Sequence, residues 1–393
     1  MSRPPLEVAD LVRAAGDAFL ERNRHWLGGK HRKVLLAIRR CRTAALGGHL
    51  DQCSRCGHQA ISYNSCRNRH WPKCQTSARE RWIAARKQEL LPTPYVHIVF
   101  TLPRHLAPLV LQNRKLFYGL LFHASAATLL QVAQDPRHLG AEIGFFSVLH
   151  TWSQKLTLHP QVHCVVLAGG LSPDHTRWIS SRKNFFLPKQ VLSRVFRGKF
   201  IAALKQAFRN GQLRFAGTLT LLAEPKIFAA WLRPLYRQDW VVYLKGPFGG
   251  PQHVLHYLGR YTHRVAISNH RLDAFTDGQV TFRWRAQQNQ QKLMTLSLDE
   301  FLRRFLLHIL PKGFMRIRNF GFLANRRRAA LQTICFHRLA VTSSTTSETQ
   351  SSATEHLTAL HPCPRCGQPM VIALRLTAVE LQLRSPPVPS VAA

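Results

Sequence analysis

The chain has 393 residues, 45% of them hydrophobic, which is enough for two or three folded domains with ample core. Lysine and arginine number 55 against 19 acidic residues, giving a formal net charge of +36 that opposes compact folding unless a polyanion offsets it. This excess favours nucleic acid as the partner over an anionic membrane surface, and it disfavours a merely solvated basic surface.

The first 50 residues are predicted to be helical. Apolar residues follow one side of residues 6–20, and a second helical segment, 31–46, ends at Gly47-Gly48. The beginning of the chain has no apolar signal core, and no segment reaches the roughly 18 uninterrupted apolar residues of a spanning helix. We therefore expect a cytosolic protein.

A cluster of cysteines follows, CSRCGHQAISYNSCRNRHWPKC, at residues 53–74. The nine cysteines of the chain are odd in number and clustered, which favours a metal over disulfides. The C-x-x-C pair that opens the cluster supplies half of a zinc tetrahedron, and Cys74 is a good third ligand. The fourth is Cys66 or His70, because Trp71 occupies the position three residues before Cys74. A set of free buried thiols is the alternative; the candidate ligands are Cys53, Cys56, Cys66, His70 and Cys74.

The rest of the chain is predicted to mix helices and strands. We expect helices at 77–92, 105–133, 251–261 and 300–310, with short helices and basic loops over 184–235. Strands are expected at 95–103, 156–167 and 239–245, and a hairpin over 269–285 turns at Asp277-Gly278. Residues 341–356 are polar and low in complexity, which predicts a flexible linker.

The predicted strand LHPQVHCVV carries His159, Gln161 and His163 at every second position. Side chains two residues apart share one face of a strand, so these three form a polar face that is suited to holding a metal ion. A purely structural polar face is equally compatible with the spacing. His97 and His150 are further candidate ligands.

Two tyrosines, Tyr257 and Tyr261, are four residues apart and share a face if their segment is helical. A half-buried helix face is the ordinary meaning of this spacing. The neighbouring cations, among them Arg260 and Arg264, favour loss of the phenolic proton. A phenolate that attacks a phosphodiester leaves a covalent phosphotyrosine and a free 3′-hydroxyl, and a metal ion opposite it polarises the phosphate.

Basic residues near the cysteines and near residue 320 are expected to contact DNA. In the later group arginines alternate with phenylalanines, which suits single-stranded DNA because arginine follows the backbone and exposed aromatic rings stack on bases. Solvated helix faces are the alternative. The expected DNA contacts are Arg67, Arg69, Lys73, Arg260, Arg264, Arg316, Arg318, Arg326, Arg327 and Arg328. The interleaved rings, many of them expected in the core, are Phe301, Phe305, Phe314, Phe320 and Phe322.

The C-terminal segment HPCPRCG holds a second C-x-x-C pair, Cys363 and Cys366, which makes half of a zinc site. His361, Cys335 and His337 are candidates to complete it. A simple turn with free thiols is equally compatible.

Seven blocks occur in order between about residues 30 and 330: AIRRCRTAALGGH, YNSCRNRHWPKCQ, VFTLP, VLHTWSQKLTLHPQVHCVV, PFGGP, YLGRYTHRVAISN and GFLANRRRA. In these blocks the chain resembles the rolling-circle, two-tyrosine transposases of the insertion-sequence ninety-one family, which belong to the HUH (His-hydrophobe-His) nucleases. The family's two catalytic tyrosines fall on Tyr257 and Tyr261. The resemblance implies structural zinc in an N-terminal domain and a catalytic Mg²⁺ or Mn²⁺.

We therefore expect an α+β protein with three parts. A helical, zinc-binding DNA-recognition domain is predicted at 1–92, and an HUH-type catalytic domain with a central antiparallel sheet flanked by helices at 93–335. A flexible linker with the C-terminal C-x-x-C segment follows at 336–393. The resemblance also exposes departures: Gln161 replaces the first histidine of the HUH pair, and Trp71 stands where the family has a third zinc cysteine. A glutamine oxygen is a legitimate ligand for Mg²⁺ or Mn²⁺ and is neutral, as imidazole is.

The predicted function is nicking and rejoining of single-stranded or hairpin DNA at transposon ends, through a 5′-phosphotyrosine, in the bacterial cytoplasm at the nucleoid. One alternative is an impaired copy that only binds DNA, which Gln161 and Trp71 motivate. The other is a rolling-circle replication initiator or relaxase, which uses the same tyrosine chemistry on a different DNA.

Overall fold

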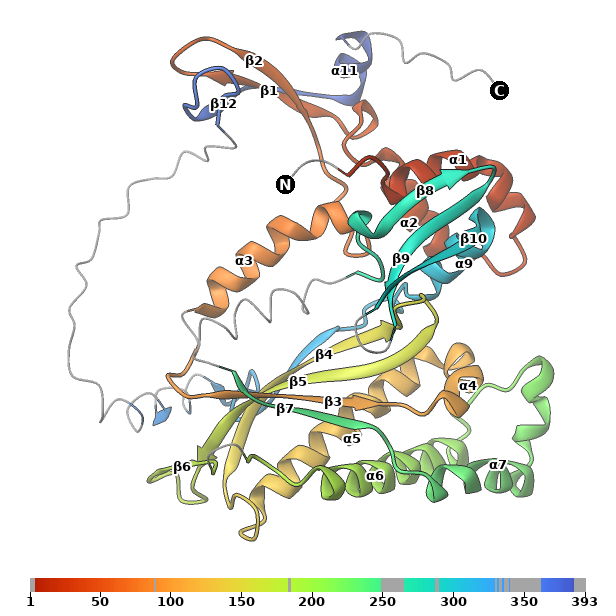
Figure 1. Ribbon diagram of the computed structural model, residues 1–393, viewed down its shortest axis with the longest axis vertical. Coiled ribbons are helices and arrows are strands. Elements are labelled where there is room, and N and C mark those ends of the chain that lie inside the picture. The colour runs from red at the N-terminus through yellow and green to blue at the C-terminus, as the bar shows by residue number, and fades with distance from the viewer. Residues whose placement is uncertain are drawn as a thin grey trace. The chain divides into compact units, whose positions relative to one another are not determined.

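The computed structural model describes residues 4–87, 90–182, 185–248, 265–286, 290–328, 331, 334–335, 339 and 362–384 (Figure 1). The chain forms two compact units. The first contains Met1–Ser77, Ile267–Leu306 and Thr345–Ala393, and the second contains Ala78–Ala266 and Leu307–Ser344. The division predicted at residues 92 and 335 follows chain order, whereas each of these units combines separate segments. The first unit unites the two ends of the chain.

The first unit begins with the predicted N-terminal helices, which the structure confirms as α1 (Val8–Arg22), α2 (Gly29–Arg40) and the short 3₁₀ helix η1 (Ala44–Leu46). A later segment adds η5 (Asn269–Arg271), β8 (Leu272–Thr276), β9 (Gln279–Arg285), β10 (Gln291–Ser297) and α9 (Leu298–Leu307). The predicted hairpin is confirmed, since Asp277 and Gly278 have φ of 51° and 69° at the β8–β9 turn. Arg22 of α1 pairs with Asp299 of α9 at 3.0 Å and joins the two segments.

The first unit also contains a small three-stranded sheet that the sequence analysis did not predict. It consists of β1 (Gly48–Cys53), β2 (Gln59–Tyr63) and β12 (Met370–Leu376) in the order β12-β1-β2, followed by α11 (Ala378–Arg384). We call this sheet, with its two C-x-x-C turns, the ribbon. Gly47 and Gly48 do more than end a helix: a Cβ on Gly47 would lie 2.8 Å from the Leu376 carbonyl oxygen. Their lack of side chains lets the C-terminal segment approach.

The second unit is built on an antiparallel sheet in the strand order β11-β4-β5-β3-β7, with β6 paired to β5. The bounds are β3 (Tyr95–Thr101), β4 (Glu142–Trp152), β5 (Leu158–Leu171), β6 (Trp178–Ser180), β7 (Val242–Phe248) and β11 (Ile317–Gly321). The strands predicted at 95–103, 156–167 and 239–245 are confirmed as β3, β5 and β7. Strand β4 was missed, although it is the longest neighbour of β5.

Helices cover one face of this sheet (Figure 1). They are α4 (Ala107–Gln112), α5 (Arg114–Gln134), α6 (Lys189–Arg209) and α7 (Pro225–Arg237), with the short 3₁₀ helices η3 (Arg104–Leu106) and η4 (Gly217–Ala223). Two further elements, η2 (Pro72–Cys74) and α3 (Gln75–Lys87), come before the first strand of the sheet in the chain. The core beneath them is rich in phenylalanine, and Phe100 and Phe196 pack with ring centroids 4.9 Å apart. The prediction of only short helices over 184–235 is wrong, because α6 has 21 residues and buries a full apolar face.

Within the described part of the chain, α5 is the one helix long and apolar enough to cross a membrane by length and composition. Of its most apolar stretch, 61% is buried in the second unit. Phe117, Leu121 and Leu129 are fully enclosed there. This is the burial expected of a core helix. The predicted α+β fold is confirmed by the two units together, each of which combines helices with an antiparallel sheet.

Candidate functional site

The predicted polar face lies on the side of the large sheet opposite to helices α5 and α6. The alternate β5 residues Val162 and Cys164 point into the core under those helices, and Val165 belongs to a smaller apolar cluster on the other face. Because side chains alternate along a strand, Gln161 and His163 share the face of Val165. One end of that face is therefore apolar and the other is polar.

Two further histidines meet His163 on this face. His97 of β3 places its Nε2 3.0 Å from Nδ1 of His163, and the two rings are stacked 5.1 Å apart. The ring of His150 on β4 lies 4.2 Å from that of His163, and His150 stands opposite Gln161 in the β4–β5 ladder. The structure thus brings both additional candidate ligands to the predicted strand. All three histidines are buried.

The protonation of this cluster follows from its burial. Burial, and after it the charge of Lys245, lowers the pKa of His97 to about 4, so His97 is neutral near pH 7. Its Nε2 can then accept a hydrogen bond from Nδ1–H of His163. That tautomer leaves the lone pair of His163 on Nε2, the arrangement in which an imidazole binds a metal ion. His97 therefore fits the role of a residue that orients a ligand.

The remaining predicted ligand, His159, lies at the start of β5 and is half-buried. Burial lowers its pKa. Strand geometry places its Cα about 13 Å from that of His163, with Gln161 between them. One ion reaches both histidines only if the two rings lean toward Gln161, so the nearest donors to His163 on this strand come from Gln161.

Strand β7 adds a phenol to the same face. Tyr243 stands opposite Val99 of β3 and is 53% exposed, and its ring lies 6.5 Å from that of His97. The predicted nucleophiles Tyr257 and Tyr261 lie outside the described residues, as do Arg260, Arg264 and the helix predicted at 251–261. Among the described tyrosines, Tyr243 is thus a natural control for the chemistry predicted at the other two.

Several of the predicted DNA-binding cations already have partners in the protein. Lys73 pairs with the buried Glu7 at 2.8 Å, and Arg327 forms a two-pronged ion pair with Glu142. The guanidinium of Arg318 lies 4.4 Å from the ring centroid of Phe122, and burial lowers its pKa. Arg67 and Arg326 are exposed. Their contacts with DNA remain predictions.

The phenylalanines interleaved with these arginines are not a surface for base stacking. Phe301, Phe305, Phe314 and Phe322 are at most 4% exposed, and Phe320 is half-buried. Phe301 and Phe305 belong to the apolar side of α9, which is buried. The four-residue spacing of these two rings is typical of a helix face that packs against the core. The prediction that many of the five rings belong to the core is confirmed, and stacking on bases is excluded for the four buried ones.

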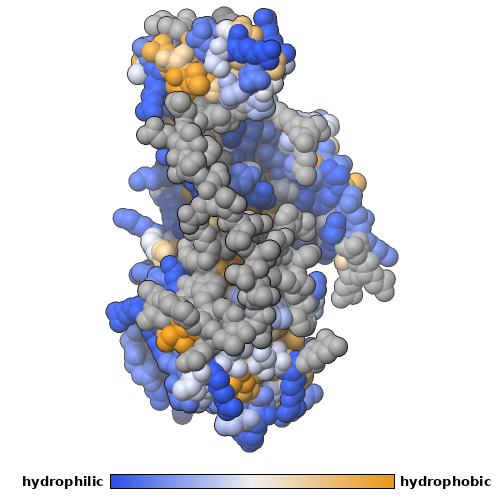
Figure 2. All heavy atoms as spheres, turned by 90° about the vertical axis from the view of Figure 1, so that its left-hand side faces the viewer, coloured by the Kyte–Doolittle hydropathy of each residue, from blue (hydrophilic) through white to orange (hydrophobic). Residues whose placement is uncertain are grey.

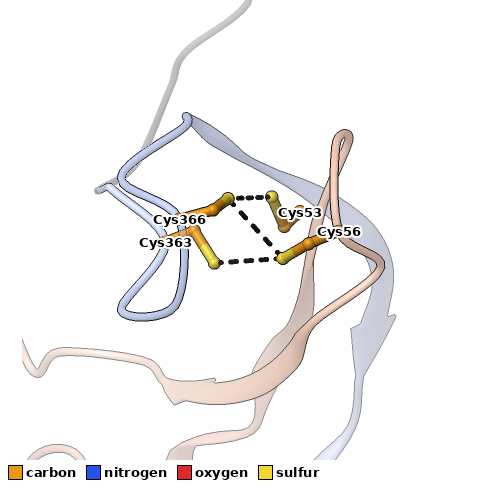
Figure 3. Close-up of side chains that lie close together, drawn as sticks. All are labelled: Cys53, Cys56, Cys363 and Cys366. Atoms are coloured by element: carbon orange, nitrogen blue, oxygen red, sulfur yellow. Dashed lines mark hydrogen bonds between the residues drawn. The ribbon is translucent and has the colours of Figure 1, made fainter.

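The predicted zinc ligands are divided between two clusters. In the first, Cys53 and Cys56 meet the C-terminal pair Cys363 and Cys366 (Figure 3). The sulfur–sulfur distances are 3.5 Å for Cys53–Cys366 and 3.6 Å for both Cys56–Cys363 and Cys56–Cys366. Ligand sulfurs about 2.3 Å from a tetrahedral zinc ion lie about 3.8 Å apart, whereas a disulfide needs about 2.05 Å. The four thiols therefore fit zinc.

The local backbone favours thiolates in this cluster. A hydrogen bond from the backbone N–H of Cys56, and a weaker one from that of Arg55, lower the pKa of Cys53 to about 6 against the opposing effect of burial. In the C-terminal turn, burial opposes ionisation of Cys363, but the backbone N–H groups of Arg365 and Cys366 outweigh it and lower the pKa. Both first cysteines are prepared to bind a cation.

The second cluster contains Cys66 and Cys74 together with Cys41, at the end of α2. Sulfur–sulfur distances are 3.5 Å for Cys41–Cys74 and 3.7 Å for Cys66–Cys74. His70 is not a member of either cluster in the described part of the chain. The expectation of one site formed by residues 53–74 is therefore corrected. The sequence contained two signals for the correct grouping, a cysteine just upstream at position 41 and a second C-x-x-C pair.

Of the other candidates for the C-terminal pair, Cys335 does not contribute to it. Cys335 is buried in the apolar cluster of the second unit, with Tyr95 and Val165. His361 and His337 lie outside the described residues. The partners of Cys363 and Cys366 come instead from about 310 positions earlier in the chain, as the sequence separation of Cys53 and Cys366 shows.

Comparison with known proteins gives two family matches along the chain. The family described as "Transposase zinc-binding domain" matches residues 11–102, and the family described as "Putative transposase" matches residues 144–330. The first match includes the cysteines at 41–74 but not the C-terminal pair. The second includes strands β5 and β7 and the predicted tyrosines.

Two relatives cover most of the chain. A protein of Sinorhizobium fredii (strain NBRC 101917 / NGR234) named "Putative transposase y4qJ" is 51% identical over 385 residues, which is 96% of each chain. The "Transposase for insertion sequence element IS801" of Pseudomonas savastanoi pv. phaseolicola is 33% identical over 296 residues, 73% of this chain and 68% of the relative. No solved structure matches the chain.

Proposed function

Because the chain belongs to the insertion-sequence ninety-one family of transposases, we propose that it nicks and rejoins single-stranded DNA at the ends of a mobile element during rolling-circle transposition. The observation that carries the proposal is the polar face of β5, where Gln161 and His163 stand on a central antiparallel sheet with His97 and His150 beside them. The transposase of IS801 supports the same assignment by its name.

In the proposed reaction, the phenolic oxygen of Tyr257 or Tyr261 attacks the phosphorus of the scissile phosphodiester. The bond from phosphorus to the 3′ oxygen breaks, and that oxygen takes up a proton and leaves as a 3′-hydroxyl. The 5′ side stays on the tyrosine as a phosphodiester. Rejoining is the same exchange with a new 3′-hydroxyl, so no external energy source is required. Arg260 and Arg264 are proposed to favour the phenolate.

The donors on β5 suit a hard divalent cation. His163 and Gln161, with His159 at the end of the row, would hold Mg²⁺ or Mn²⁺, which polarises the scissile phosphate when bound. His97 orients His163 through the 3.0 Å nitrogen–nitrogen contact and does not itself need to touch DNA. Glutamine keeps the charge of the site unchanged relative to histidine, but it is a weaker ligand for softer cations.

DNA binding is proposed to draw on the net charge of +36. Exposed cations such as Arg67 and Arg326, together with Arg69, Arg316 and Arg328, are the proposed phosphate contacts. Each phosphate contact adds to the salt dependence of binding, so the logarithm of the affinity falls steeply with the logarithm of salt concentration. This dependence is expected even if catalysis is impaired.

The test is covalent capture. The purified full chain is mixed with labelled single-stranded DNA carrying the element's end, with Mn²⁺, Mg²⁺ or EDTA, and the product is run on a denaturing gel. We expect a metal-dependent adduct that is lost in Tyr257→Phe or Tyr261→Phe. Tyr243→Phe is the matched control, because it removes the described tyrosine on the same sheet face and should leave the adduct in place.

Two outcomes would redirect the proposal. An adduct that forms only after Gln161→His would identify this copy as a DNA-binding protein with impaired catalysis. An adduct that forms on replication-origin DNA, and not on an element end, would favour a replication initiator or relaxase. An adduct lost in Tyr243→Phe, with both other variants active, would overturn the assignment of the nucleophile.

A further inference from the structure

The two C-x-x-C turns of the ribbon have the same local structure although they lie at opposite ends of the chain. Their sequences are CSRCGHQ and CPRCGQP. In each turn the glycine has a left-handed φ, 69° at Gly57 and 74° at Gly367, and donates its N–H to the carbonyl of the first cysteine, at 3.1 and 2.9 Å. The N–H of each first cysteine is in turn bonded to the carbonyl five residues later, at 2.9 and 2.7 Å. The two turns are therefore equivalent halves of one site.

Strand pairing places these halves face to face. β1 ends at Cys53, and β12 begins at Met370, which is its antiparallel partner. The first turn leaves β1 at the same end of the ladder at which the second turn enters β12. As a result all four sulfurs point into one space (Figure 3), each within 4.8 Å of the others.

In the described residues the apolar core around these cysteines is small, although Leu376 is buried at the other end of β12. The ribbon's buried cluster consists of Cys53, Cys363 and Met370, with Ala60 and Cys366 packed against them. Large apolar side chains of its strands are exposed instead: Ile61 38%, Val371 38%, Ile372 39% and Leu374 46%. Figure 2 shows apolar side chains, in orange, on the surface at the top of the view, where the ribbon lies. A sheet this small needs a stabilising interaction other than apolar burial, such as a bound metal ion.

We infer that one zinc ion joins the two ends of the chain, bound by the thiolates of Cys53, Cys56, Cys363 and Cys366, and that this ion holds β12 in the ribbon. The C-terminal pair lies outside the segment that matches a zinc-binding domain, residues 11–102. The inference therefore makes the C-terminal segment a structural part of the zinc-binding unit. It does not depend on the proposed DNA chemistry.

Zinc content and hydrogen exchange of the full chain test the inference. The purified protein is compared with Cys363→Ser and Cys366→Ser, and metal is counted by mass spectrometry. We expect each variant to contain about one zinc ion fewer per chain and the amides of residues 370–376 to exchange at least roughly tenfold faster, because the free energy of metal binding is also folding free energy for such a site. Exchange in β3 and β5 should stay unchanged.

Two further variants keep the test decisive. Cys363→His preserves a ligand, since three cysteines and one histidine are an accepted zinc set, and it should restore both the zinc content and the protection of β12. Cys335→Ala removes a thiol that lies in neither described cluster and should leave the zinc content unchanged. Unchanged zinc in Cys363→Ser, or lost zinc with β12 still protected, would overturn the inference. Neither readout involves DNA cleavage, so it stands or falls separately from the proposed function.

Discussion

The ribbon and the large sheet are both antiparallel, yet different forces hold them together. The large sheet buries a continuous core against α5 and α6, and strand β3 is buried at every residue. Among its described residues the ribbon buries a small cluster around its cysteines, with Met370, and Leu376 at its other end, and it leaves Leu374 46% exposed. The free energy of apolar burial is proportional to the apolar area removed from water. In a metal site, by contrast, the stabilising free energy comes from the four bonds between metal and ligands. The large sheet should therefore stay folded without metal, whereas the ribbon should tolerate truncation of its exposed apolar residues.

The largest effect is expected in the core of the second unit. Phe100→Ala removes a fully buried ring and should destabilise that unit by about 3–5 kcal/mol, since a cavity adds to the lost transfer free energy. Urea denaturation measures this change. Phe185→Ala, at a ring that is 44% exposed, is the matched control and should cost less than about 1 kcal/mol. Equal effects of the two variants would contradict the assignment of the core.

A pH effect on stability is also expected in the second unit. His308 donates from Nε2 to the Leu156 carbonyl at 3.0 Å and contacts the hydroxyl of Thr151 at 3.2 Å. Burial lowers its pKa to about 4, below the ordinary value of 6.5. The unfolded chain therefore binds more protons between these values, and stability falls as pH drops from 6.5 to 4, by up to about 1.4 kcal/mol per pH unit.

Denaturation of the wild type and His308→Gln across pH 4–7 measures this effect. The variant should lose this part of the slope, because the titrating group is gone. The difference between the two profiles is the informative quantity, since His97 also titrates low and contributes to both. Identical slopes would show that His308 is not held neutral in the folded protein.

The three-cysteine cluster offers an intermediate effect. Trp71 precedes Cys74 by three residues, the spacing of a C-x-x-C turn, and the Cys74 N–H bonds to its carbonyl at 3.2 Å. Its indole N–H is buried without a hydrogen-bond partner in the described structure. Trp71→Cys should therefore raise zinc affinity at Cys41, Cys66 and Cys74 by roughly tenfold or more, because zinc prefers four ligands.

Competition with a chelator measures that affinity. Trp71→Ala is the matched control, because it removes the same buried ring without adding a ligand. Any loss of packing is then common to both variants, and their difference reports the new thiolate. An affinity no higher in Trp71→Cys than in Trp71→Ala would show that position 71 does not face the cluster.

The smallest effect is expected on the surface of the ribbon. Leu374→Ala truncates a side chain that is 46% exposed and should change stability by less than about 1 kcal/mol, with no loss of zinc. Met370→Ala, at a fully buried residue opposite Cys53, should be the more damaging of the two. Thermal unfolding with zinc present compares them. A large loss in Leu374→Ala alone would mean that apolar contacts, and not the metal, stabilise the ribbon.

Much of the large sheet could be predicted from local patterns. Residues 95–101 are rich in β-branched and aromatic side chains and form β3, and the alternation of Gln161 and His163 on β5 was correctly assigned to one face. Strand β4 was missed because GFFSVLHTW is apolar without alternation, as a strand buried on both faces is. Periodicity alone does not distinguish such a run from a helix.

The zinc ligands show the limit of local reasoning. Spacing predicted Cys53, Cys56, Cys66 and Cys74 as zinc ligands but grouped them into one site. A turn motif indicates which thiols can bind a metal and does not indicate which other residues complete the site. The same limit applies to the phenylalanines near residue 320. Their alternation with arginine left open which rings are exposed, and the elements packed against them decide that most are buried.

The sequence by itself determined the membership of the family, the basic surface that calls for a polyanion and the residue types that can bind metal, because these depend on composition and on short spacings. Only the tertiary structure decided that Cys363 and Cys366 belong with Cys53 and Cys56, and that His97 and His150 surround His163. These contacts join residues far apart in the chain. These contacts are set by the pairing of strands. The register of that pairing depends on how whole elements pack together, so no single segment of the sequence predicts it.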